Sequence, residues 1–122
     1  MKPMIIAGAL FAFFGIVLGA FAAHTLKERL AADMFAVFEV GVRYHIYHAL
    51  ALFVVAWVIS AYPQSGVHIA GYCFMAGIVI FSGSLYLLSL TGLRWFGAIT
   101  PIGGVSFLVG WLWLAWSVWR AA

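Results

Sequence analysis

Four long apolar runs separated by short polar segments constrain this chain more than any other feature of its sequence. A helix needs roughly 20 apolar residues to cross a hydrocarbon core about 30 Å thick. The sequence therefore predicts an all-α integral membrane protein, a four-transmembrane-helix bundle that forms a single domain over residues 1–122. We expect the spans at Met4–Ala23, Arg43–Tyr62, Val67–Leu90 and Ile99–Trp119.

The composition agrees with a membrane protein and argues against several functions. Of the 122 residues, 67% are hydrophobic and 7% are charged, whereas a soluble domain has about half and about a quarter. The net charge of +3 comes from scattered Lys and Arg residues, so we expect the lipid bilayer and no nucleic acid as a partner. The sequence has no nucleophile paired with a base, no paired carboxylates, no phosphate-binding loop and no CxxC motif. We expect no catalytic residues, no enzyme activity and no cofactor.

The first apolar run and the positive charges bear on topology. Met4–Ala23 is longer than the roughly 7–15-residue core of a secretory signal peptide, so we expect it to remain as the first span. Four spans place both termini on one side of the membrane. Positive charge does not decide which side faces the cytoplasm, because it occurs both at the termini and in the opposite loops.

Three connections separate the predicted spans. Residues 24–39 hold most of the charged side chains, and their apolar residues recur at helical spacing, which predicts a short interfacial helix between the first two spans. Pro63 and Gly66 predict a tight turn in the second connection. Thr100 before Pro101 has the form of a helix N-cap, so we expect the fourth span to begin there.

Small residues recur along the predicted spans at steps of three, four or seven. Helices in lipid associate mainly by close packing, because lipid tails are as apolar as the side chains themselves. We therefore expect these small residues to lie at helix–helix contacts within the chain. The positions are Gly8, Ala12, Gly15 and Gly19, then Ala70, Cys73, Gly77 and Ser84, then Gly103, Ser106, Gly110 and Ser117.

Glu39 and Arg43 are the charged residues closest to the second apolar run. They are four positions apart and so share one helical face, which predicts an ion pair where the helix enters the membrane. The alternative is that the two residues gate a polar path for a proton or a substrate, since charged residues within membrane spans often mark such paths.

Histidine and hydroxyl side chains gather toward one end of the predicted bundle. His45 and His48 share a face at the depth of His24, which fits either hydrogen-bonded structural histidines or a metal or haem site. No carboxylate or cysteine accompanies them at a diagnostic spacing, and we expect no metal. A further interpretation is a pocket for a lipid or small ligand, lined by His24, Tyr44, His48, Ser82, Ser84 and Tyr86.

The start of the fourth predicted span has the chemistry of an anion site. Unpaired backbone N–H groups in the first turn of a helix favour negative groups. Gly103 and Gly104 lie in that turn, and Arg94 precedes it. The segment fits either ordinary helix capping or an anion or lipid-phosphate site at these three residues.

The chain also resembles a known family in stretches that come from all four spans. These stretches are Leu18–His24, Tyr44 with His48–Leu52, Phe81–Tyr86 with Leu90–Gly92, and Thr100–Gly104 with Phe107 and Gly110–Trp111. They resemble the YgdD family of small bacterial membrane proteins, catalogued as domain of unknown function 423 and related to eukaryotic transmembrane protein 256. The family pattern differs at three positions, with glycine for Ala22, a hydroxyl for Val40 and commonly glutamine for His45. The resemblance implies a multi-pass protein of the bacterial inner membrane and implies no activity.

Three functions are compatible with these patterns, and we expect the first. It is a non-enzymatic membrane protein that associates with itself or serves a larger membrane complex, and that holds a lipid or small ligand. The alternatives are a small transporter or channel component and a histidine-ligated haem or metal membrane protein.

Overall fold

The computed structural model describes residues 1–121, and within that range the chain is helical with no strand. The four stretches Lys2–Arg29, Ala32–Ala61, His68–Thr91 and Arg94–Arg120 are long and apolar enough to cross a membrane. The predicted four-span architecture is therefore confirmed. In chain order the elements are α1 (Lys2–Phe21), η1 (Ala22–Leu26), α2 (Lys27–Arg29), α3 (Ala32–Ala61), α4 (His68–Gly77), η2 (Ile78–Ser82), α5 (Gly83–Thr91), η3 (Arg94–Ala98) and α6 (Thr100–Arg120).

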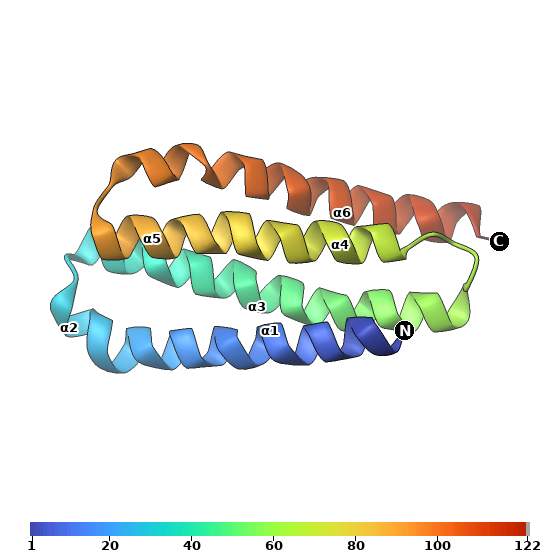
Figure 1. Ribbon diagram of the computed structural model, residues 1–122, viewed down its shortest axis with the longest axis horizontal. Helices are drawn as coiled ribbons and strands as arrows, with labels where there is room; N and C mark the ends of the chain where they lie inside the picture. Colours follow the sequence, from blue (N-terminus) through green and yellow to red (C-terminus); the bar gives the residue numbers. More distant parts are fainter. Residues whose placement is uncertain (122) are drawn as a thin grey trace.

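The long helices lie side by side in the order of the chain (Figure 1). Helix α1 packs along α3, α3 packs along α4 and α5, and α4 packs along α6. The outer helices α1 and α6 therefore leave broad apolar faces exposed, which suits surfaces that contact lipid tails. Both termini lie at the same end of the molecule, as an even number of spans requires (Figure 1).

Glycines lie at the contacts between neighbouring helices, as predicted. A β-carbon on Gly103 would come within 2.7 Å of the α-carbon of Phe81, so the α6 backbone approaches the third span directly. Gly110 packs against the ring of Phe74, and Gly15 packs against the side chain of Ile46 on α3. Gly15 therefore takes part in a contact inside the chain.

The connection between the first two spans contains the predicted short helix, but that helix is much shorter than expected. Helix α2 has three residues, and residues 32–39 belong to α3. Phe38 shows the reason, because it is fully buried and packs with Ala22 and Leu26. The later part of the segment that indicated an interfacial helix thus forms the first turns of α3, with Phe38 on their inner face. Helical spacing alone does not distinguish a separate interfacial helix from the first turns of a longer helix.

Candidate functional site

A groove lies between α3 and α6, with a volume of about 420 Å³. Tyr44 and Phe81 face each other with ring centroids 5.1 Å apart, and Phe81 reaches Phe107 at 5.4 Å, so three spans contribute to the groove. Leu108 on the groove is 65% exposed, so the groove opens on the lipid-facing surface. The lining residues are Tyr44, His48, Phe81, Pro101, Gly104, Val105, Phe107, Leu108 and Trp111.

Hydrogen bonds hold His48 rigidly in the wall of this groove. Its Nδ1 lies 2.7 Å from the carbonyl oxygen of Tyr44, which can only accept a hydrogen bond. Its Nε2 accepts a hydrogen bond from the indole Nε1 of Trp111 at 3.0 Å. The imidazole is therefore neutral, with its proton on Nδ1, and it stacks on Phe107 at 3.6 Å between centroids. Neither ring nitrogen is free to bind a metal.

His45 is a second buried histidine, and it connects three spans. Its Nε2 donates to the carbonyl oxygen of Phe11 on α1 at 2.8 Å. Its Nδ1 lies 2.8 Å from the hydroxyl of Tyr86 on α5, and in the neutral ring this nitrogen accepts from the tyrosine O–H. A glutamine amide also offers N–H donors and a carbonyl acceptor, so the glutamine that is common here in the family pattern has the groups for the same contacts.

The predicted ligand cluster is divided in the structure. Only Tyr44 and His48 line the groove. Ser82 instead donates from Oγ to the carbonyl oxygen of Gly41 at 2.7 Å, which ties η2 to α3. Tyr86 belongs to the His45 contact.

The remaining members of the cluster also lie away from the groove. Ser84 donates to the carbonyl oxygen of Phe81 at 2.8 Å and bonds to the hydroxyl of Thr100. His24 is exposed in η1, at the end of the first span. These hydroxyl groups therefore bond within and between helices, and they do not form the polar pocket that was expected.

Most residues of the groove escaped prediction because they are apolar or aromatic. Phe107 and Leu108 have no polar group, and the single indole N–H of Trp111 does not by itself mark a site in an apolar helix. Phe107, Trp111 and Gly104 did occur in the stretches that carry the family resemblance, and that was the available signal.

The three histidines do not converge. His45 is directed toward α1 and His48 toward α6, while His24 is exposed. Among residues 1–121 no three His, Cys, Asp or Glu side chains come together in a way that would hold a metal ion.

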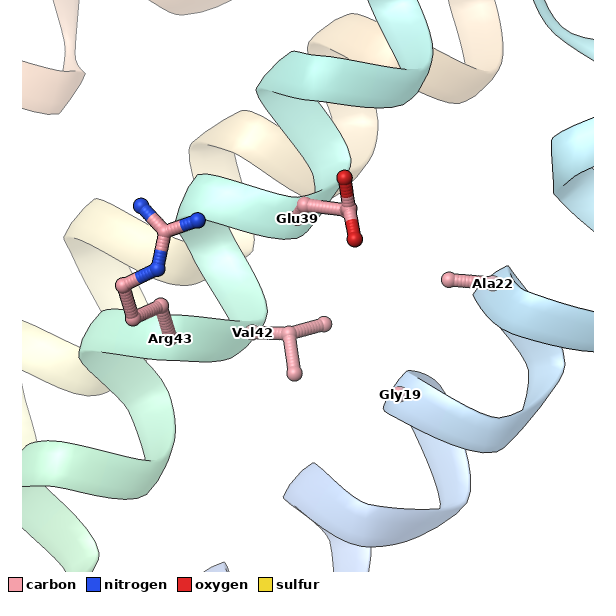
Figure 2. A pocket seen from close by; sticks show the side chains of 5 residues that line it. All are labelled: Gly19, Ala22, Glu39, Val42 and Arg43. Atoms are coloured by element: carbon pink, nitrogen blue, oxygen red, sulfur yellow. The ribbon is translucent and has the colours of Figure 1, made fainter.

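Glu39 and Arg43 line a second cavity of about 220 Å³ between α1 and α3 (Figure 2). The expected ion pair is not formed, because Figure 2 shows the Arg43 guanidinium directed away from the Glu39 carboxylate. Both side chains are exposed, and an exposed pair contributes only about 0–1 kcal/mol against the loss of side-chain freedom. Their exposure also gives no support to a polar path through the bundle.

The start of α6 does not offer the free N–H groups of an anion site. Helix η3 continues into α6, and the N–H groups of Ile99 and Ile102 donate to carbonyl oxygens one turn back, at 3.0 Å each. Thr100 is not the N-cap that was expected, since α6 has no side-chain cap. Gly103 packs against Phe81 and Gly104 lines the groove, while Arg94 is exposed in η3.

Comparisons with known proteins agree with a membrane protein. A family model described as "Protein of unknown function (DUF423)" matches residues 18–104. The UPF0382 membrane protein YwdK of Bacillus subtilis is 49% identical over 113 residues, which cover 92% of each chain. A UPF0382 membrane protein of Staphylococcus saprophyticus is 48% identical over 114 residues, 93% of this chain and 94% of that one. Another, from Staphylococcus haemolyticus, is 45% identical over 98% of each chain. No solved structure matches the chain.

Proposed function

The chain belongs to the DUF423 family of membrane proteins, and we propose that it is a non-enzymatic, multi-pass protein of the bacterial plasma membrane. In this proposal the groove between α3 and α6 holds one chain of a lipid. The observation that supports this most is the chemistry of the groove. Its surface is apolar and opens toward lipid, and the ring nitrogens of His48 and Trp111 are already bonded to each other or to the backbone. An alkyl chain is the occupant that needs no further hydrogen bond.

The dimensions of the groove also support a lipid chain. Its volume of about 420 Å³ lies within the range of about 300–1,000 Å³ that is usual for ligand sites. Along α6 the lining runs from Pro101 to Trp111, which is about 15 Å at 1.5 Å per residue. That length is half of a hydrocarbon core of about 30 Å. The groove thus accommodates a chain that belongs to one leaflet.

A substitution that fills the groove tests the proposal. A leucine at Gly104 has room for its β-carbon, since the nearest heavy atom would be 3.8 Å away, but its remaining carbons would enter the groove. Gly83→Leu is the matched control, because a β-carbon at Gly83 has no neighbour within 4 Å. Protein purified in mild detergent is examined by native mass spectrometry for retained lipid.

We expect Gly104→Leu to retain about tenfold less lipid, because losing the burial of two methylene groups already weakens binding by about 1.6 kcal/mol. Gly83→Leu is expected to behave like the unchanged protein. Equal retention by the two variants would contradict the proposal.

The alternative to a lipid chain in the groove is a protein helix, from a second copy of this chain or from another subunit of a larger complex. A photoreactive leucine analogue at Leu108 separates the two cases, because this side chain lines the groove and is exposed. Cross-links to lipid in native membranes support the proposal. Cross-links to protein alone would replace it with self-association or an accessory role.

A further inference from the structure

The depth of the cavity at Glu39 and Arg43 follows from the lengths of its two helices. Helix α3 has 30 residues, about 45 Å, and so exceeds a hydrocarbon core of about 30 Å. Counting roughly 20 residues back from Ala61 places the edge of the core near Val42. The same count forward from Lys2 along α1 reaches Phe21. Both helices therefore place this cavity at the boundary between lipid tails and headgroups.

Glu39 and Arg43, the two charged residues at this boundary, are exposed and do not form an ion pair with each other. Side chains on a helix lean toward its N-terminus, and for Arg43 that direction leads outward, toward the headgroup layer (Figure 2). The Glu39 carboxylate lies one turn farther out, on the side of α3 that faces Ala22 in η1 (Figure 2). Both residues thus line the cavity and carry opposite charges at headgroup depth, with the carboxylate directed toward α1 and the guanidinium directed away from it.

We propose that this cavity binds the headgroup of an amine-bearing zwitterionic phospholipid. The Arg43 guanidinium offers the donors that suit a phosphate. The Glu39 carboxylate accepts hydrogen bonds from the primary ammonium group, and it repels a headgroup whose only charge is negative. A quaternary ammonium group has no N–H donor for this carboxylate and binds less well.

The walls of the cavity leave room for such a headgroup. Gly19 and Ala22 contribute almost no side chain on the α1 side. The backbone changes from α-helix to the π-helical turn η1 at Ala22, and π-helical turns occur frequently at functional sites. This irregular turn therefore lies against the proposed site itself.

The headgroup site is separate from the groove. Glu39 and His48 are nine positions apart on α3, which at about 100° per residue places them on opposite sides of the helix. The two sites therefore require separate tests, and either proposal can fail alone.

The test measures headgroup preference. Wild-type protein is placed in nanodiscs with equal amounts of phosphatidylethanolamine, phosphatidylglycerol and phosphatidylcholine of the same acyl chains, and retained lipids are counted by native mass spectrometry. We expect phosphatidylethanolamine to be retained about tenfold over the other two. Glu39→Gln is expected to abolish the preference over phosphatidylglycerol, and Arg43→Gln to lower the retention of all three.

Matched controls come from the same end of the molecule. Glu28→Gln and Arg29→Gln change exposed charges on α2 that do not line the cavity, so the preference should persist in both. Gly104→Leu should also keep the preference while it loses lipid from the groove. Equal retention of the three lipids by wild-type protein, or an unchanged preference in Glu39→Gln, would overturn the proposal.

Discussion

The indole Nε1 of Trp111 on α6 donates a hydrogen bond to Nε2 of His48 on α3, with 3.0 Å between the two nitrogens. The residues are 63 positions apart, on helices that both pack chiefly against the third span. Since an indole N–H only donates, this bond determines the tautomer of the histidine. The pair also joins the two walls of the groove, since both residues line it.

Trp111→Phe removes the donor and leaves Nε2 of His48 without a partner in an apolar environment. We expect the free energy of unfolding to fall by about 1 kcal/mol, the usual size for a hydrogen bond within a membrane protein. Unfolding in mixed micelles with increasing dodecyl sulfate measures it. Trp116→Phe is the control, because Trp116 is 53% exposed and faces lipid. Equal losses in the two variants would show that the hydrogen bond contributes nothing.

His45→Gln and His45→Leu separate hydrogen bonding from packing at the junction of three spans. The glutamine amide can donate to the carbonyl oxygen of Phe11 and accept from Tyr86, whereas leucine can do neither. We expect His45→Leu to lower the free energy of unfolding by about 1–3 kcal/mol, and His45→Gln to lose less than half as much. The same micelle titration measures both. A glutamine variant no more stable than the leucine variant would refute this account.

Gly103→Ala and Gly104→Ala add the same methyl group to adjacent positions of α6. At Gly103 the new carbon would collide with the backbone of Phe81, which cannot move aside as a side chain can. At Gly104 the nearest atom would be 3.8 Å away, an ordinary contact. We expect Gly103→Ala to destabilise the protein by about 1–3 kcal/mol and Gly104→Ala to be neutral or slightly stabilising. Thermal unfolding in detergent measures both variants. Equal melting temperatures for the two variants would contradict this expectation.

Zinc and chelator should leave the stability of the protein unchanged. The ring nitrogens of His45 and His48 are engaged with groups on other residues, so a metal would have to break those bonds. A ligand that binds only the folded state raises the melting temperature by mass action. We therefore expect no change in melting temperature with added Zn²⁺ or with EDTA. A rise with zinc that disappears in a His48→Gln variant would show a histidine metal site.

The accuracy of prediction differed between the spans and the site for a physical reason. Apolar runs such as Val67–Leu90 predicted spans well, because a helix in lipid must satisfy its own backbone and present apolar side chains nearly everywhere. The prediction began the second span at Arg43, whereas α3 begins at Ala32. The residues of α3 that precede Arg43 include charged side chains, which are compatible with a helix that extends beyond the hydrocarbon core. Composition alone does not show that the helix continues outside the core.

The candidate site was predicted less well because its chemistry depends on partners from distant parts of the chain. Polar residues such as Ser82 and Tyr86 were expected to line a ligand pocket, yet each found a partner across a helix contact. Glu39 and Arg43 have the spacing of an ion pair and do not pair. Spacing along one helix shows which side chains share a face, and it does not show what that face meets.

The sequence by itself determined that the chain is a membrane protein, that it crosses the bilayer four times and that its helices pack at small residues. The reason is that the partition of a helix into lipid depends on the residues of that helix alone. Only the tertiary structure decided that His48 meets Trp111, that His45 connects α1 to α5 and that an apolar groove lies between α3 and α6. In a medium as apolar as the side chains, the choice among helix neighbours depends on surface fit and a few hydrogen bonds. Both arise only when distant spans come together.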